Sequence, residues 1–357
     1  MTPSQELNQS KVEAFGQKMA SALNGAAIAL MASIGHQTGL FDTMAMLPPS
    51  SSHQIATAAK LQERYVREWL ASLVAGQVID YDPVQGTYTL PPEHASLLTR
   101  AAGPNNIASG AQVVALVAEV EQGIVASFRN GGGVPYAQFP RFQQMMAEFS
   151  DAAHATLIET KLPLVPGLVA HLQAGIDVAD IGCGYGRAIN LMAQAFPNSR
   201  FVGYDFSEEA ISMARAEATQ MGLTNARFEA NDVAMLGVTD QFDFVTAFDA
   251  IHDQARPADV LREIAIGLRT RGIFLMAEAA ASSKLEENLD RMMSPWQYAC
   301  SCMHCMTVSL ALDGEGLGLM WGEQKARTML ADAGFTHIEI KQLESDQDTN
   351  YYIATKV

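Results

Sequence analysis

A glycine-rich turn at residues 182–186 constrains the fold of this 357-residue chain more than any other feature. It follows an apolar run that begins at Ile176, and it leads into a helical pattern over residues 188–196. Glycine lets the backbone adopt positive φ and lets a ligand come close, while the first turn of the helix offers unpaired N–H groups. A strand, a tight turn and a helix in this order predict a site for a nucleotide-like cofactor.

The spacing of the glycines separates two classes of cofactor. A dinucleotide-binding turn has the pattern G-x-G-x-x-G, which requires a small residue five positions after Gly182. Arg187 stands there, and Gly186 instead makes the spacing G-x-G-x-G, which disfavours a dinucleotide. The stretch Asp180–Gly186 resembles the first motif of the class I S-adenosylmethionine-dependent methyltransferases, whose glycine turn wraps the methionine end of the cofactor.

Two further strand ends agree with this resemblance. Phe201–Asp205 has the pattern of a second strand that ends in an acid, and Arg227–Asp232 has that of a third strand that ends in Asn231 and Asp232. The resemblance implies that Asp205 accepts the ribose hydroxyls and that Asn231 and Asp232 hold the adenine. A solvated aspartate at a strand end is the alternative for Asp205. The cofactor-binding residues implied in this way are Asp180, Gly182, Cys183, Gly184, Gly186, Asp205, Phe206, Asn231, Asp232, Val233 and Phe248. Cys183 is interpreted as a cofactor or packing residue and not as a nucleophile.

The alternation of strand and helix patterns in the second half of the chain predicts an α/β fold. Strands are expected near residues 177–181, 200–205, 226–232, 242–248 and 272–278, and the helical patterns between them indicate a parallel sheet. A helix at 323–333 precedes two strands at 337–343 and 351–356, which a short link makes antiparallel. A Rossmann-like sheet closed by a C-terminal hairpin is typical of class I methyltransferases and differs from a dehydrogenase.

The N-terminal part of the chain has the pattern of a winged helix. A helical pattern over 8–34 precedes two short ones at 52–60 and 62–74, and strands at 78–81 and 87–90 flank a turn. The region resembles the winged-helix dimerisation domain of bacterial methyltransferases similar to small-molecule O-methyltransferases. We expect three parts: a winged-helix dimerisation domain at 1–105, connecting helices that roof the active site at 106–165, and a catalytic domain at 166–357. Small residues at 19–34 and the apolar stretch 107–126 predict a homodimer.

A winged helix is also typical of DNA-binding regulators, so the charge of the chain is used to separate an enzyme from a regulator. Residues 51–100 hold four basic and five acidic side chains, and the whole chain carries a net charge of −16. Such a surface repels phosphate backbones and anionic lipid, so a small-molecule partner is favoured over nucleic acid or membrane. No charged segment with an apolar core opens the chain, which predicts a cytoplasmic protein. A cofactor-sensing transcriptional regulator with little or no catalysis is the alternative function.

The fourth expected strand leads into Ala247–Asp253, which contains the candidate catalytic residue His252. Small-molecule O-methyltransferases carry a His-Asp pair at this place, so the resemblance implies that His252 acts as a general base. An imidazole with a pKa of about 6.5 is largely neutral at cytoplasmic pH and can accept a hydroxyl proton. A histidine that only packs the loop is the alternative.

The acceptor is expected to be a small, apolar, hydroxyl-bearing molecule held under a cap at residues 279–322. Tyr136, Phe142 and Met145 from the connecting helices and Trp296 from the cap are the candidate substrate-binding residues, with plain core packing as the alternative. The cap also contains Cys300–Cys305, whose soft side chains suit zinc or arsenite. We expect no metal site, because these ligands all fall within six residues and no second pair stands elsewhere.

Overall fold

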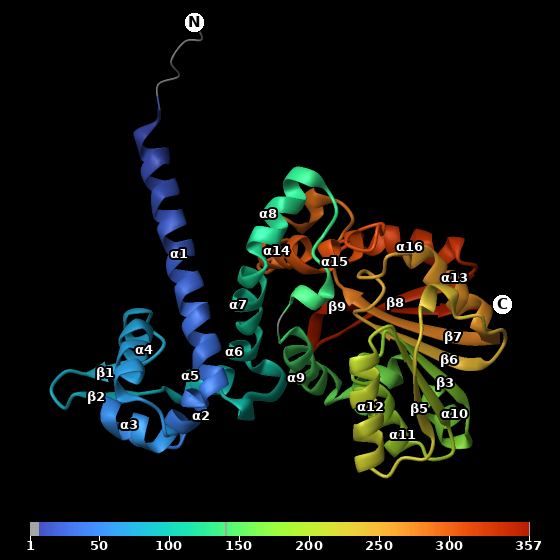
Figure 1. Ribbon diagram of the computed structural model, residues 1–357, viewed down its shortest axis with the longest axis horizontal. Helices are drawn as coiled ribbons and strands as arrows, with labels where there is room; N and C mark the ends of the chain where they lie inside the picture. The colour runs from blue at the N-terminus through green and yellow to red at the C-terminus, as the bar shows by residue number, and fades with distance from the viewer. Residues whose placement is uncertain (1–6, 140, 357) are drawn as a thin grey trace, which may run out of the picture. The chain divides into compact units, whose positions relative to one another are not determined.

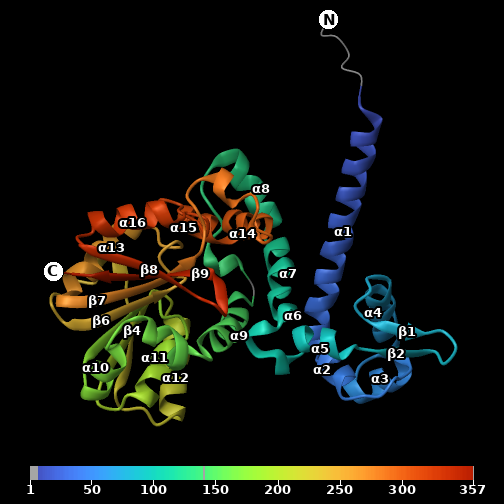
Figure 2. The same cartoon turned by 180° about the vertical axis from the view of Figure 1, so that it is seen from behind.

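The computed structural model describes residues 7–139 and 141–356 (Figures 1 and 2). The chain divides into two compact units, Met1–Ala118 and Glu119–Val357, and each is described by itself. The first unit begins with the long helix α1 (Gln9–Thr38). It continues with α2 (Leu40–Ala45), α3 (Ser52–Ala59), α4 (Glu63–Ala75), β1 (Asp80–Asp82), β2 (Thr87–Thr89), α5 (Pro92–Leu98), η1 (Arg100–Asn105) and α6 (Ile107–Gly110), and α7 (Gln112–Glu119) reaches the boundary.

The core of the first unit lies between α1, α2, α3 and α4. Ser51 begins α3 with a capping box, in which its hydroxyl accepts the N–H of Gln54 and the Gln54 side chain accepts the N–H of Ser51. Trp69 of α4 is buried, packs against Phe41 and donates its indole N–H to the carbonyl of Met31 at 2.8 Å. Two helices in tandem followed by the antiparallel pair β1 and β2 form a winged helix, although the strands are shorter than the sequence predicts.

The first part of α1 exposes its apolar side chains. Val12, Phe15, Met19 and Leu23 lie at helical spacing and are 45–71% exposed. The stripe that the sequence predicts is therefore present and is not covered within its own unit. Helix α1 also has the length and mean hydropathy (1.2) of a membrane-spanning helix, which is weak evidence because core helices give the same signal.

The second unit is built on a seven-stranded sheet with the order β5-β4-β3-β6-β7-β9-β8. Strands β3 to β7 are parallel, and β9 is antiparallel to both β7 and β8. The strands are β3 (Asp177–Ile181), β4 (Arg200–Asp205), β5 (Ala226–Ala230), β6 (Phe242–Phe248), β7 (Leu268–Ala279), β8 (His337–Leu343) and β9 (Asp346–Thr355). The prediction of a parallel sheet with a C-terminal antiparallel pair is confirmed.

Helices cover both faces of this sheet, because alternate side chains of each strand point to opposite sides. Val178 of β3 packs in a cluster with α10, α11 and α12, whereas its neighbour Ala179 packs in a second cluster with α13 and α16. The helices and helical turns are α8 (Glu121–Asn130), η2 (Tyr136–Gln138), α9 (Phe142–His154), η3 (Leu157–Lys161), η4 (Leu162–Leu164), α10 (Leu168–Ala174), α11 (Arg187–Ala195), α12 (Glu208–Gln220), η5 (Val233–Met235), α13 (Pro257–Gly267), η6 (Leu285–Asn288), α14 (Ser294–Cys300), η7 (Ser301–Cys305), α15 (Met306–Leu310) and α16 (Glu323–Asp332).

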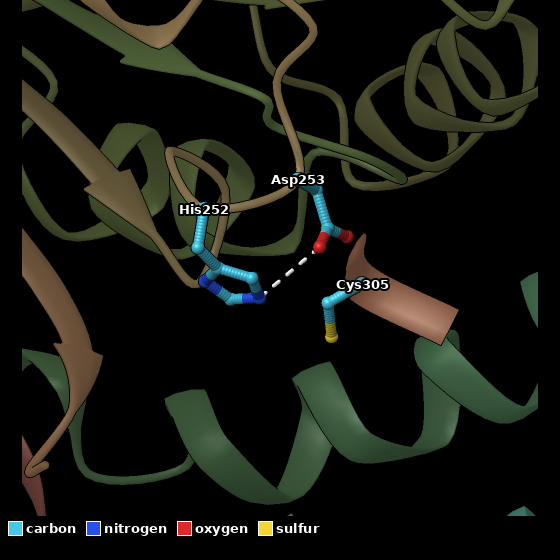
Figure 3. A group of neighbouring side chains, drawn as sticks. All are labelled: His252, Asp253 and Cys305. Carbon is cyan, nitrogen blue, oxygen red and sulfur yellow. Dashed lines mark ion pairs between the residues drawn. The ribbon is translucent and has the colours of Figure 1, made fainter. Parts of the chain in front are cut away.

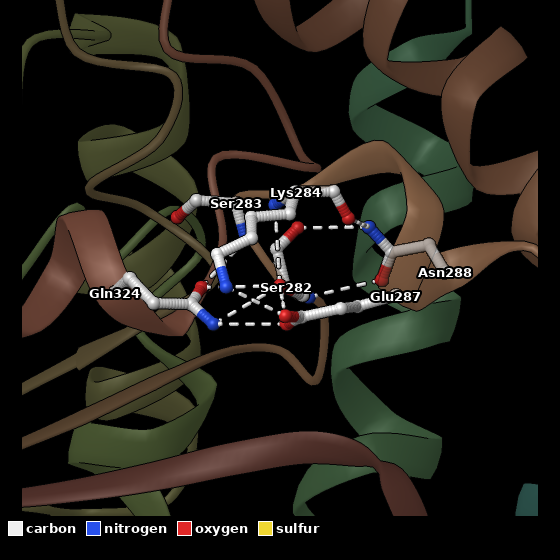
Figure 4. A network of polar contacts seen from close by, with 6 residues as sticks. All are labelled: Ser282, Ser283, Lys284, Glu287, Asn288 and Gln324. Atoms are coloured by element: carbon white, nitrogen blue, oxygen red, sulfur yellow. Dashed lines mark hydrogen bonds and ion pairs between the residues drawn. The ribbon is translucent and has the colours of Figure 1, made fainter.

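The predicted cap segment after β7 is closed at its base by a network of polar contacts (Figure 4). Asn288 is buried and donates from its amide to the carbonyl of Ser282, while the N–H of Ser283 donates to Gln324 of α16 at 2.7 Å. The N–H of Glu323 donates to the carbonyl of Ala281 at 2.9 Å, so the two ends of the segment meet. The helices between these ends, α14, η7 and α15, are therefore held over the sheet by a fixed base.

The glycine segment 131–133 contacts the cap segment through its last residue. Gly131 and Gly132 have positive φ, but Gly133 packs closely against α15. A Cβ at Gly133 would lie 1.9 Å from the carbonyl oxygen of Thr307, and the Thr307 hydroxyl accepts the N–H of Val134 at 2.8 Å. The segment thus brings η2 against the cap.

Candidate active site

The glycine turn lies at the carboxyl end of β3, at the edge of the sheet where all five parallel strands end. Gly182, Gly184 and Gly186 have φ of +69°, +51° and +72°, conformations that other residues rarely adopt. A Cβ at Gly182 would meet Ala250 at 2.6 Å and one at Gly186 would meet Phe228 at 2.3 Å, whereas Gly184 has no atom within 4 Å of that position. The turn is therefore packed on two sides and leaves open space at Gly184, as a ligand cradle requires.

Asp205 faces this turn from the end of β4. Its Oδ2 accepts the N–H of Gly184 and its Oδ1 accepts the N–H of Ser207, both at 2.9 Å. Burial raises the pKa of Asp205, although these N–H groups oppose the shift. Each carboxylate oxygen has a second lone pair, so the side chain can also accept two ligand hydroxyls. The structure brings the predicted turn and the predicted ribose acceptor together.

Asp180 is buried near the end of β3, and Cys183 is half-buried within the turn itself. Burial raises the pKa of Asp180 to about 7, while a hydrogen bond from the Thr246 hydroxyl at 2.6 Å opposes the shift. Burial also raises the pKa of Cys183 well above its usual value, and the nearby carboxylates add to this shift. A thiol that stays protonated is a poor nucleophile, which agrees with the interpretation of Cys183 as a packing or cofactor residue.

The residues expected around the adenine differ in the hydrogen bonds and ion pairs that they already form. The N–H of Asn231 donates to the carbonyl of Asp205 at 2.9 Å, which fixes the end of β5 beside β4. Asp232 accepts the N–H of Ala234 and pairs with Arg256 at 2.7 Å, so an adenine amino group would share this carboxylate with Arg256. The other members of the set vary in exposure: Val233 is buried, Phe206 is exposed, and Phe248 is half-buried under the ammonium group of Lys161.

His252 lies in the loop after β6 and is held between two carboxylates. Its Nδ1 contacts Oε2 of Glu278, a buried residue of β7, and its Nε2 lies 3.2 Å from Oδ1 of Asp253 (Figure 3). Glu278 also accepts the N–H of Ile251 at 3.1 Å and the indole N–H of Trp321 at 3.3 Å. Burial opposes the charged form of His252, but the two carboxylates outweigh it and raise the pKa of His252 well above its usual value. The largely neutral imidazole that the sequence predicts is therefore wrong for this environment, because both carboxylates stabilise the charged form.

An aromatic cluster lies beside this pair. Tyr136 donates its hydroxyl to Oδ2 of Asp253 at 2.6 Å, and its ring packs against Phe142, Phe206 and His304. The His304 imidazole stacks on Phe142 with 4.2 Å between ring centroids. The structure therefore joins two of the predicted acceptor residues, Tyr136 and Phe142, to the predicted base. Met145 is buried on the same helix as Phe142, and Trp296 is half-buried on α14.

Two buried polar atoms at this place accept or donate no hydrogen bond. They are Nε2 of His304 and Oδ1 of Asp253, although the latter forms an ion pair with Nε2 of His252 at 3.2 Å. Burial lowers the pKa of His304, so its imidazole is neutral and one ring nitrogen can accept a proton or a hydrogen bond. Buried polar groups without partners are costly, which indicates that this part of the site binds a polar group.

A cavity of about 190 Å³ lies at the opposite, amino-terminal edge of the sheet, between Arg200, Arg227 and Arg269. Its charges are already balanced, because Arg200 and Arg269 pair with Asp177 and Arg269 also pairs with Asp243. The cofactor residues lie at the carboxyl ends of the strands, so this cavity does not belong to the site.

Comparison with known proteins gives the family. Residues 26–100 match the family described as the Rv2258c-like winged HTH domain, and residues 172–334 match the methyltransferase domain. This chain joins a winged-helix domain to a methyltransferase domain. The predicted membership of the winged-helix class I methyltransferases is confirmed.

Individual relatives resemble parts of this winged-helix methyltransferase. Trans-aconitate 2-methyltransferase of Variovorax paradoxus is 41% identical over 70 residues, which are 20% of this chain and 25% of that protein. Malonyl-[acyl-carrier protein] O-methyltransferase of Bacillus cereus is 25% identical over 148 residues, 42% of this chain and 49% of that protein. The chain thus spans at most about half the length of these curated relatives.

Solved structures share the fold over nearly the whole chain. Human N-acetylserotonin methyltransferase, solved in complex with S-adenosylmethionine, superposes with a TM-score of 0.69 at 15% identity and covers 100% of this chain and 99% of its own. The order of the sheet and the helical N-terminal region agree with the predicted fold class.

Four residues of the site were missed by the sequence reasoning: Asp253 as a partner of Tyr136, Glu278, His304 as a member of the aromatic cluster, and Trp321. Glu278 left a signal, because it is the single acid in the apolar run Gly272–Ala281 that forms most of β7. A carboxylate inside a buried strand requires a partner, and such residues gather at functional sites. Asp253 left a signal in the His-Asp pair, but its contact with Tyr136 did not, and neither did the contacts of His304 and Trp321, because those partners are distant in the sequence.

Proposed function

We propose that this winged-helix methyltransferase binds S-adenosylmethionine at the glycine turn and transfers its methyl group to a small, apolar, hydroxyl-bearing acceptor, releasing S-adenosylhomocysteine. The observation that carries the proposal is the joint geometry of Gly184 and Asp205. An open cradle beside a carboxylate that retains free lone pairs fits a nucleoside, and α11 begins directly after the turn. The family match and the solved relative with bound S-adenosylmethionine support the same cofactor.

Two tasks are assigned to the residues of the chain: they position the acceptor, and they remove the proton of its hydroxyl group. When bound, S-adenosylmethionine supplies the electrophilic methyl carbon together with a positive charge that opposes protonation of a nearby imidazole. Tyr136, Phe142, Met145 and Trp296 are proposed to enclose the acceptor, which aligns its oxygen with that carbon. His252 is proposed to take the hydroxyl proton through Nε2, while Glu278 holds Nδ1 and stabilises the imidazolium that forms.

The class of acceptor is inferred from the side chains around His252. The aromatic cluster around Phe142 favours an apolar ring or chain, and the unpaired Nε2 of His304 favours a polar substituent. An acceptor whose apolar part packs on the cluster around Phe142 and whose hydroxyl reaches Nε2 of His252 satisfies both conditions. The family relationship includes O-methyltransferases, which agrees with an oxygen acceptor.

The assembly that we propose is a cytoplasmic homodimer. The exposed stripe of Val12, Phe15, Met19 and Leu23 on α1 is too long and regular for isolated surface residues, and a second copy of α1 has the matching stripe. The winged helix is assigned to this assembly and not to DNA. Both arginines of α4 are engaged in ion pairs with glutamates of the same helix, Arg64 with Glu68 and Arg67 with Glu63, which leaves little positive charge for phosphates.

Calorimetry with S-adenosylhomocysteine tests the cofactor assignment. The wild-type chain is expected to bind one equivalent. Asp205→Asn is expected to weaken binding by roughly 10- to 100-fold, because the amide loses one acceptor oxygen and one hydrogen bond to a charged acceptor corresponds to about 1.5–3 kcal/mol. Asp240→Asn is the matched control, since Asp240 is exposed and pairs with Lys356 away from the turn. Absence of binding by the wild-type chain, or unchanged binding in Asp205→Asn, would contradict the assignment.

A further inference from the structure

Three potential metal ligands from two distant segments converge next to the acceptor residues. The ligand atoms of His252, Asp253 and Cys305 all lie within 4.8 Å of one another. His252 and Cys305 are buried, and the Asp253 side chain is nearly so. Figure 3 shows the His252 ring turned toward the Asp253 carboxylate, with Cys305 on the facing helical segment η7. The second ligand pair that the cysteine-rich stretch lacks in the sequence is thus supplied by the loop after β6.

The surroundings of these ligands match those of a metal-binding histidine. Such a histidine donates its other ring N–H to a carboxylate, and the ligating carboxylates are themselves hydrogen-bonded. Glu278 holds Nδ1 of His252, which leaves Nε2 directed at the group. The Tyr136 hydroxyl holds Oδ2 of Asp253, and Oδ1 of Asp253 faces the group, 3.2 Å from Nε2 of His252.

The distance between Nε2 of His252 and Oδ1 of Asp253 agrees with a tetrahedral ion. Two ligand atoms that each lie 2.0–2.1 Å from a tetrahedral zinc are about 3.3–3.4 Å apart. Nε2 of His252 and Oδ1 of Asp253 are 3.2 Å apart. A zinc-bound sulfur would lie about 3.6 Å from Nε2. The thiol of Cys305 is within 4.8 Å, so a small side-chain rotation completes the set.

We propose that Nε2 of His252, Oδ1 of Asp253 and Sγ of Cys305 form a binding site for a thiophilic divalent cation of the zinc class. One carboxylate and one thiolate balance the two charges of the ion, and the thiol proton of Cys305 and the proton on Nε2 of His252 both pass to solvent on binding. Three protein ligands leave a fourth position for water or for an oxygen of the acceptor. The site does not depend on methyl transfer. An ion here occupies the Nε2 lone pair that the proposed base requires, so its presence opposes that reaction.

Cobalt substitution tests the site without measuring activity. The full chain is treated with a chelator, the chelator is removed, and Co²⁺ is added while the absorption spectrum is recorded. The wild-type chain is expected to bind one equivalent with a thiolate-to-cobalt charge-transfer band in the near ultraviolet, which Zn²⁺ then abolishes by displacement. Cys305→Ser removes the band, and Asp253→Asn weakens binding at least 10-fold. Glu278→Gln weakens binding 10- to 100-fold, the usual effect of losing the carboxylate behind a metal-binding histidine.

Cys302→Ser is the matched control, because Cys302 is a half-buried thiol of the same segment η7 but does not belong to the group. It is expected to keep the band at wild-type strength. Circular dichroism and the thermal midpoint establish that each variant is folded, and the isosteric Asp253→Asn serves if Cys305→Ser is not. The proposal is overturned if the wild-type chain gives no charge-transfer band, if the band survives in Cys305→Ser, or if Cys302→Ser abolishes it.

Discussion

The cofactor side and the acceptor side of the site are built in different ways. The cofactor side is local: Asp180, Gly184 and Asp205 lie within 26 residues on two neighbouring strands and the turn between them. The acceptor side joins Tyr136, His252, Glu278 and His304, which come from four separate segments. The cofactor side is held by backbone conformation and main-chain N–H groups, and the acceptor side by buried charges and ring contacts. Substitutions on the cofactor side should therefore change stability and cofactor affinity, whereas those on the acceptor side should change the rate of methyl transfer.

The largest effect is expected on the acceptor side, at His252. His252→Gln should lower the methylation rate by roughly 10²- to 10⁴-fold, the usual range for loss of a general base, while the affinity for S-adenosylhomocysteine stays within about threefold. Single-turnover kinetics with a hydroxyl acceptor, identified by screening metabolites for release of S-adenosylhomocysteine, measures it. His171→Gln is the control, because His171 lies on α10 outside the described site. A rate near that of the wild type, or loss of cofactor binding, would assign His252 to packing.

The next effect concerns stability on the cofactor side and depends on pH. Asp180 has a pKa of about 7 when folded, above its unfolded value of about 4. Between these values the folded chain holds a proton that the unfolded chain releases, so this group makes stability fall as pH rises from about 4 to about 7, by at most roughly 4 kcal/mol. Asp180→Asn should flatten this part of the profile in urea unfolding. An unchanged slope, or the same flattening in Asp240→Asn, would contradict the prediction.

A third comparison separates two glycines of the same turn. Gly186→Ala should destabilise the chain by about 2–3 kcal/mol, because its Cβ would lie 2.3 Å from Phe228 at positive φ. Gly184→Ala should lower the free energy of unfolding by only about 1 kcal/mol, since no atom lies near the position of its Cβ. Its effect on binding should be the larger one: among folded molecules, Gly184→Ala should weaken S-adenosylhomocysteine binding more than Gly186→Ala does. Thermal unfolding and calorimetry on both variants measure the difference. Equal stability losses would show that the packing at Gly186 is not as tight as described.

The smallest effect is expected where the two sides meet, at Tyr136. Tyr136→Phe keeps the ring packing on Phe206 and Phe142 and removes the hydrogen bond to Asp253, which corresponds to about 1–2 kcal/mol or roughly 5- to 30-fold in kcat/KM. Cofactor affinity should not change. Tyr81→Phe in the winged-helix unit is the control. If Tyr136→Phe changed cofactor affinity and left kcat/KM unaltered, Tyr136 would belong to the cofactor side.

The sequence predicts the cofactor side of the site better than the acceptor side, because the cofactor side is local in the chain. Gly182, Gly184, Gly186 and Asp205 could be named in advance, because a strand that ends in a tight turn imposes positive φ and leaves its mark as alternate glycines. Glu278 and His304 could not, because nothing in their neighbouring residues records which segment packs against them. The roles of Tyr136 and Phe142 were suggested by resemblance, and the ring contacts with His304 that join them are a tertiary feature.

The sequence by itself determined the sheet and its cofactor edge, because alternating apolar strands, amphipathic helices and glycine turns are stabilised by interactions between residues close in the chain. The tertiary structure alone decided that the loop after β6 meets η7. That meeting brings His252 and Asp253 to Cys305, and it turns a cysteine-rich stretch with too few ligands into a three-ligand group. The physical reason is that contacts between distant segments depend on how the whole core packs, and the −16 net charge and local patterns carry no record of it.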